Sequence, residues 1–94
     1  MTVLFEWDKN KAKSNQEKHQ VSFAEAATLF RDPLAIIFDD EEHSNSEPRE
    51  IIIGHSEQGK FLLVSFTERN GFIRIISARK ATSLERQEYE NRQR

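Results

Sequence analysis

The stretch that decides the fold is residues 60–80, with the sequence KFLLVSFTERNGFIRIISARK. Two runs of β-branched and aromatic residues, at 60–67 and 72–80, lie on either side of Asn70-Gly71. An Asn-Gly pair between two such runs is the strongest short-range signal of a β-hairpin, because both residues accept the positive φ angles of its tight turn. We therefore expect two long antiparallel strands here.

Further strands are expected on the N-terminal side of this hairpin. Residues 50–56 form a third β-prone run, which a short turn ending at Gly59 separates from the hairpin. Residues 34–38 are a short apolar run and predict a buried strand. Residues 39–48 contain no apolar side chain and predict an exposed loop. Residues 3–7 predict a short first strand.

Three helices are predicted by residues whose side chains accept hydrogen bonds from the free N–H groups of a first helical turn. The candidate N-caps are Asp8, Ser22 and Thr82, and the last two precede a glutamate at the spacing of a capping box. The expected helices cover residues 9–19, a segment from 23 to the Asp32-Pro33 break, and 83–91. Leu84 and Tyr89 are the expected apolar anchors of the third helix.

The order of predicted elements is β-α-α-β-β-β-β-α, which is typical of an α+β fold. We expect an antiparallel sheet with its helices packed on one face and the other face partly open. A chain of 94 residues is one domain, so the prediction covers residues 1–94 as a single unit. An open sheet face is a natural binding surface.

Charge is unevenly distributed along the chain. Residues 1–50 hold 6 Lys and Arg against 11 Asp and Glu, whereas residues 51–94 hold 8 against 5. The second half is therefore the part expected to bind a polyanion. The longest apolar run is only five residues, far below the length of a membrane span. We expect a soluble, cytoplasmic protein without a membrane partner.

The composition excludes several chemistries. The absence of cysteine removes thiolate nucleophiles, disulfides and Cys-ligated zinc. His19, His43 and His55 are far apart and fit no zinc-binding spacing, so neither a metal nor another cofactor is expected. The acidic segment around Asp39 and Asp40 lacks the glycine and alternating oxygen donors of a cation-binding loop. Three glycines in total leave no loop to cradle a nucleoside triphosphate.

Arginines on the predicted strands are the remaining candidates for chemistry. The hairpin brings Arg69 and Arg74 near one end, and Arg79 lies further along the strand of Arg74. Strict alternation places Arg74 and Arg79 on opposite faces, because five residues is an odd separation. A β-bulge between them, or a strand end at Arg79, would place both on one side. The pattern leaves these alternatives open.

Several short motifs follow one another at characteristic spacing along almost the whole chain. They are FEWD at 5–8, KH at 18–19, VSFAEA at 21–26, DPLA at 32–35, DD at 39–40, HS at 43–44, IG at 53–54, TER at 67–69, IRIISAR at 73–79 and AT at 81–82. In their order and spacing they resemble the BrnT toxins of bacterial type II toxin–antitoxin pairs. The resemblance implies a RelE-like fold. Gln20 stands where glycine is common in that family, after Lys-His, so it must either accept a positive φ or end the first helix differently.

The resemblance also implies a function and partners. The expected activity is that of an endoribonuclease, a metal-independent hydrolase of RNA phosphodiester bonds that arrests translation. The expected inhibitor is a BrnA-type antitoxin with a ribbon-helix-helix domain, in a complex of two toxins and two antitoxins that meets operator DNA only through the antitoxin. The alternative is a binding module with weak catalysis that tunes transcriptional autorepression. A general RNA-binding domain is disfavoured, because the phenylalanines on the strands are better explained as core.

Residue roles follow from what such an enzyme needs. The 2′-OH of RNA is the nucleophile, so the protein has to move protons and stabilise charge on the phosphate. Arg69, Arg74 and Arg79 are the candidate phosphate ligands. His19 is the candidate general acid or base, because imidazole exchanges protons near neutral pH, and Glu68 is a weaker candidate base.

Each of these roles has a structural alternative. His19 is equally explained as a helix C-terminal residue favoured by the helix dipole, and Arg79 as an ion-pair partner of Glu85 or Glu88. The basic side chains expected to attract RNA are Lys9, Lys11, Lys13, Lys18 and Lys80.

Overall fold

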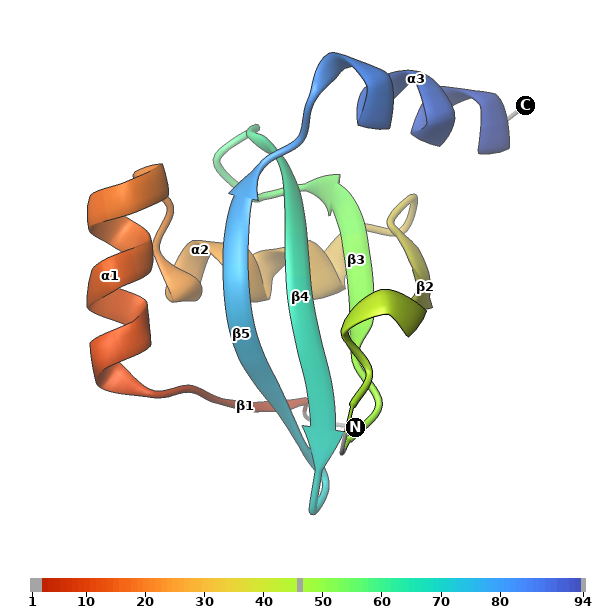
Figure 1. The fold of residues 1–94 in the computed structure, drawn as a ribbon. Helices are drawn as coiled ribbons and strands as arrows, with labels where there is room; N and C mark the ends of the chain where they lie inside the picture. The colour runs from red at the N-terminus through yellow and green to blue at the C-terminus, as the bar shows by residue number, and fades with distance from the viewer. Residues whose placement is uncertain (1–2, 46, 94) are drawn as a thin grey trace.

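The computed structural model of the chain describes residues 3–45 and 47–93. Within them the chain forms β1 (Leu4–Glu6), α1 (Lys9–His19), α2 (Phe23–Ala27), β2 (Ile36–Asp39), β3 (Glu50–His55), β4 (Phe61–Arg69), β5 (Phe72–Lys80) and α3 (Ser83–Arg92). Short 3₁₀ turns at Thr28–Arg31 and Glu41–His43 follow α2 and β2. The predicted order of strands and helices is confirmed (Figure 1).

The five described strands form one sheet in the order β1-β5-β4-β3-β2. The pairs β2–β3, β3–β4 and β4–β5 are antiparallel. β1 pairs with β5 in parallel, with Leu4 opposite Phe72 and Glu6 opposite Arg74. The expectation of a purely antiparallel sheet is therefore wrong at this edge. Side-chain alternation is the same in both pairings, and only the long connection between β1 and β5 allows the parallel one.

The hairpin predicted from Asn70-Gly71 is confirmed. Asn70 has φ 52° and Gly71 has φ 82°, as a tight turn of this kind requires. β4 and β5 pair along their whole length on either side of it, from Arg69 opposite Phe72 to Leu62 opposite Lys80. This pair of strands is the centre of the sheet.

The predicted N-caps also hold. Asp8 Oδ1 accepts hydrogen bonds from the N–H groups of Asn10 and Lys11, at 2.8 and 3.0 Å. Thr82 and Glu85 complete a capping box at the start of α3. Ser22 accepts from the Glu25 N–H at 3.0 Å.

The capping box predicted at Ser22 is only half formed. The buried carboxylate of Glu25 does not return to the helix start but accepts a hydrogen bond from Ser56 Oγ at 2.7 Å. It thereby joins α2 to the end of β3.

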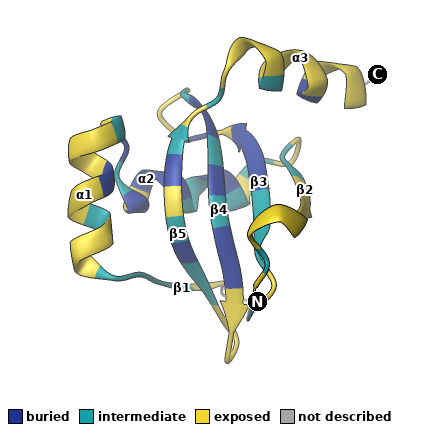
Figure 2. Ribbon diagram, in the orientation of Figure 1, coloured by how far each residue is buried: buried dark blue, intermediate teal, exposed yellow. Residues whose placement is uncertain are grey.

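The main core lies between α2 and one face of the sheet. Its buried side chains are Val21, Phe23, Ala26, Leu29, Ile52, Leu62, Val64, Phe66, Ile75 and Ala78. Buried residues concentrate in β3, β4, β5 and α2, whereas α1 and α3 are largely exposed (Figure 2).

α1 lies beside β5 and is fixed to it by Asn15. The buried Asn15 side chain accepts from the Ala78 N–H at 3.0 Å and donates to the carbonyl oxygens of Ala78 and Val21, at 2.8 and 2.9 Å. It thereby satisfies the backbone N–H and carbonyl of Ala78, as the hydrogen bonds of a neighbouring strand would. The edge of the sheet is therefore held firmly against α1.

Three packing expectations are wrong. The run at 34–38 is not buried, because β2 is an edge strand with a neighbouring strand on one side only, and Ile37 and Phe38 are 50% and 36% exposed. The helices do not share one face, because α3 packs at the end of the other face. Tyr89 anchors it as expected, at 7% exposure, but Leu84 is 65% exposed.

Candidate functional site

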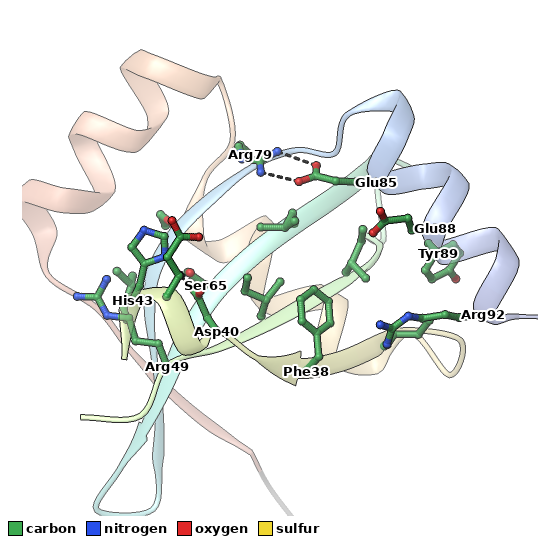
Figure 3. Close-up of a pocket in the computed structure, with 17 residues that line it drawn as sticks. Phe38, Asp40, His43, Arg49, Ser65, Arg79, Glu85, Glu88, Tyr89 and Arg92 are labelled. Carbon is green, nitrogen blue, oxygen red and sulfur yellow. Dashed lines mark hydrogen bonds and ion pairs between the residues drawn. The ribbon is translucent and has the colours of Figure 1, made fainter. Parts of the chain in front are cut away.

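The face of the sheet opposite α2 carries a groove of about 550 Å³ (Figure 3). Its floor is apolar and consists of Ile36, Phe38, Ile51, Ile53, Leu63 and Ile76. Ser65, Ser77 and Tyr89 also line it, and its charged side chains are Asp40, Glu42, His43, Arg49, Arg79, Glu85, Glu88 and Arg92. Odd-numbered residues of β3 and β4 point here because alternate side chains of a strand share a face.

A β-bulge on β5 shapes this face. Ser65 lies opposite Ser77, but the next residue of β4, Phe66, lies opposite Ile75, so Ile76 is an extra residue on β5. The extra residue reverses the alternation beyond it. Of the two alternatives left open by the sequence, the bulge is the one that occurs.

Arg74 and Arg79 consequently point to the same side. Arg79 lies opposite Leu63 and Arg74 lies opposite Thr67, and these partners are four residues apart on β4, an even separation. At about 3.3 Å per residue, the two arginines are about 13 Å apart along the sheet. The face therefore carries two arginine positions along β5.

The Arg79 guanidinium is held by Glu85 of α3. Nη1 and Nη2 donate to the two Glu85 carboxylate oxygens at 2.8 and 2.7 Å (Figure 3). The hydrogen bond from Arg79 lowers the pKa of Glu85 to about 2, and the same bond raises the pKa of Arg79. The ion pair named above as the structural alternative for Arg79 is therefore present. It does not exclude phosphate binding, because carboxylate and phosphate fit the same guanidinium fork.

The other two arginines also face glutamates. Arg69 Nη2 donates to both carboxylate oxygens of Glu47, at 3.0 and 2.8 Å, which lowers the pKa of Glu47 and raises that of Arg69. Arg74 Nη1 lies 3.8 Å from the Glu6 carboxylate on β1. All three candidate phosphate ligands thus have a carboxylate within 4 Å, and Arg69 and Arg79 are hydrogen-bonded to theirs.

A second, smaller hollow of about 320 Å³ lies between α1 and β5. Asn10, Lys11, Ser14, Asn15, Lys18 and His19 line it from α1, and Ile76 and Ser77 line it from β5. His19 is half-buried at the C-terminal end of α1. Gln20 after it has φ 56°, so this residue accepts the left-handed conformation in place of glycine.

The chain matches the family model described as the ribonuclease toxin, BrnT, of type II toxin–antitoxin systems, over residues 7–85. The chain belongs to this family. Its fold is similar to the crystal structure of the Brucella abortus ribonuclease toxin BrnT, with a TM-score of 0.68 at 24% identity, over 87% of this chain and 100% of that one. No curated protein matches the chain.

In this BrnT family member Glu68 lies away from the groove. It is opposite Ile73, whose side chain packs on the core between sheet and α2, so Glu68 points to the face opposite Arg74. There it adds to the effect of burial in raising the pKa of Glu50. The structure does not bring Glu68 together with Arg79 or His19.

The five predicted RNA-binding lysines fall into two groups. Lys11 and Lys18 line the hollow beside His19, seven residues apart on one side of α1. Lys9 and Lys13 are exposed on α1 outside the hollow. Lys80 lies opposite Leu62 of the core, so it belongs to the face opposite Arg79.

Sequence reasoning missed Arg49, Ser65 and Ser77. All three line the groove, and among the described residues Arg49 has no carboxylate within 4 Å of its guanidinium. Ser77 could have been predicted from the sequence, because it is two residues before Arg79 and alternate residues of a regular strand share a face. Arg49 could not, because its position depends on the loop after β2.

The described residues contain no group of three His, Asp or Glu side chains close enough to hold a metal ion. None of their helices combines the length and apolar character needed to cross a bilayer.

Proposed function

We propose that this chain is a metal-independent endoribonuclease toxin whose active site lies on the open sheet face around Arg79. The observation that carries the proposal is the β-bulge at Ile76, which turns Arg74 and Arg79 to one face and leaves His19 in a hollow that adjoins the groove of Arg79. Membership in a family of ribonuclease toxins supplies the reaction class.

The proposed reaction uses the substrate's own nucleophile. The 2′-oxygen attacks the adjacent phosphorus, the bond from phosphorus to the 5′-oxygen breaks, and a 2′,3′-cyclic phosphate forms. His19 takes the proton of the 2′-OH while water protonates the leaving 5′-oxygen, or it protonates that oxygen while water accepts the proton of the 2′-OH. Arg79 stabilises the charge that grows on the phosphate oxygens in the transition state. Glu85 must release Arg79 for this contact to form.

The proposed partner is a BrnA-type antitoxin with a ribbon-helix-helix domain, in a RelE-like toxin complex of two toxins and two antitoxins. It covers the groove, and only the antitoxin contacts operator DNA. The apolar floor of the groove supports this placement, because such a surface is typical of a protein–protein contact. Translation arrest follows from RNA cleavage once the antitoxin is lost.

Cleavage of a labelled single-stranded RNA by the purified protein tests the proposal. We expect cleavage that persists in excess EDTA and leaves products ending in a 2′,3′-cyclic phosphate or its hydrolysis product. Loss of cleavage in EDTA with recovery on adding Mg²⁺ would contradict the metal-independent mechanism.

One observation favours the second candidate, a binding module with weak catalysis. Each of the candidate arginines already contacts a glutamate of this chain, which would compete with RNA phosphate. Expression without the antitoxin separates the two: growth arrest with cleaved RNA supports the enzyme, and normal growth with intact RNA supports the module.

A further inference from the structure

The groove and the α1 hollow meet at the β-bulge. Ile76 and Ser77 are the residues that line both, with α1 on one side of them and β4 on the other. Figure 1 shows α1 running alongside β5 at the edge of the open face. A ligand longer than either hollow therefore has a path from one to the other across these two residues.

The charges along this path differ on its two sides. The described residues lining the α1 hollow include Lys11, Lys18 and His19 but no carboxylate. Beyond Ser77, the groove offers Arg79, which is paired with Glu85 until a phosphate replaces that carboxylate. A nucleic-acid backbone is attracted to the first side by its lysines and meets a guanidinium on the second.

Ser77 is suited to bind a ligand that crosses from one hollow to the other. It is exposed, its hydroxyl both donates and accepts, and it makes no side-chain hydrogen bond within the described part of the chain. The next residue, Ala78, has both its N–H and its carbonyl bound by Asn15, so the backbone here is fixed. The hydroxyl is thus free on a rigid support.

We propose that RNA runs from the α1 hollow across Ser77 into the groove, and that the Ser77 hydroxyl donates a hydrogen bond to a phosphate oxygen at the crossing. This places the crossing phosphate between His19 and Arg79. The inference rests on the proposed ribonuclease function and adds to it a substrate-binding residue and a path for the strand.

Binding of a non-cleavable 2′-O-methyl RNA oligonucleotide, measured by fluorescence anisotropy, tests the path. Ser77→Ala should weaken binding about tenfold, because a hydrogen bond to a charged group is lost. The matched control is Ser83→Ala, an exposed serine of α3 outside both hollows, which should bind as the unaltered protein does.

A second pair of variants tests the α1 side. Lys18→Glu and Lys13→Glu make the same charge change on one helix, but only Lys18 lines the hollow. We expect Lys18→Glu to weaken binding of the same oligonucleotide several times more than Lys13→Glu does. Thermal midpoints of all four variants should stay near that of the unaltered protein, since all four side chains are exposed.

The outcomes separate this path from the function it rests on. RNA cleavage by the unaltered protein, with Ser77→Ala binding like Ser83→Ala and Lys18→Glu like Lys13→Glu, would overturn the path and leave the ribonuclease proposal standing. Failure of the unaltered protein to bind or cleave RNA would overturn both.

Discussion

Arg74 and Arg79 project from the same face of the sheet although five residues separate them. Their partners on β4, Thr67 and Leu63, are four residues apart, and Ile76 is the extra residue that makes up the difference. A bulge interrupts regular pairing between two strands, and bulges often lie next to functional sites, where they redirect a side chain. Here the bulge turns Arg79 into the groove and away from the core.

Replacing Glu85 changes how stability depends on pH. The pKa of Glu85 is lowered to about 2 in the folded state, mainly by its hydrogen bond with Arg79, from an ordinary value of 4.5. Its stabilising contribution is therefore complete above pH 4.5 and is lost as pH falls toward 2. Glu85→Gln should lower the thermal midpoint at pH 6 and show a shallower decline between pH 5 and pH 2. Parallel declines for the two proteins would contradict the role of this pair.

The Asn15 side chain holds the edge of β5 against α1. Asn15→Ala leaves the Ala78 N–H and carbonyl and the Val21 carbonyl without this partner in a buried place. Denaturant unfolding should show a loss of at least about 3 kcal/mol, because three buried groups lose this partner and each unpaired group costs about 1–3 kcal/mol. Asn10→Ala, an exposed asparagine of the same helix, is the control and should change stability by less than about 0.5 kcal/mol.

Gln20 occupies a position that suits glycine. Its φ of 56° places a side chain in the left-handed region after α1. Gln20→Gly should raise the free energy of unfolding by about 1 kcal/mol, the cost of that conformation for an L-residue. Thermal unfolding measures it, and a lower midpoint for the glycine variant would show that the Gln20 hydrogen bond to the Glu17 carbonyl matters more than the strain.

Hydrogen exchange in the complex locates the antitoxin. If the antitoxin covers the groove, amides of β2 and β3 near Phe38 and Ile51, and of α3 near Tyr89, should exchange more slowly in the complex than in the free toxin. Protection confined to α1 would rule out direct occlusion of the groove.

The parts of the fold predicted from sequence are those set by neighbouring residues. α1 begins after Asp8 and ends before the left-handed Gln20, at the predicted residues, and Asn70-Gly71 fixes the hairpin. The errors concern long-range packing. The direction of β1, the exposure of Phe38 on an edge strand and the position of α3 depend on partners far away in the chain, which local patterns do not encode.

The candidate site shows the same division. The residue types were predicted, but the glutamate partner of Arg69 lies 22 residues away in a loop. Glu68 had a usable signal, since alternation relative to Thr67 places it on the other face. The bulge that gathers Arg74 and Arg79 had no sequence signal strong enough to choose it over strict alternation.

The central claim is that the Arg79 guanidinium acts on RNA and does more than hold α3. Arg79→Ala and Glu85→Gln both remove the charge pair, but only the first removes the guanidinium, so the two together separate structure from chemistry. Single-turnover RNA cleavage, measured below the thermal midpoint of each variant, is the direct test. We predict that Arg79→Ala lowers the rate by about 10²–10³, as loss of one preorganised donor does, while Glu85→Gln cleaves at least as fast as the unaltered protein because no carboxylate competes for Arg79. A near-normal rate for folded Arg79→Ala would contradict the claim.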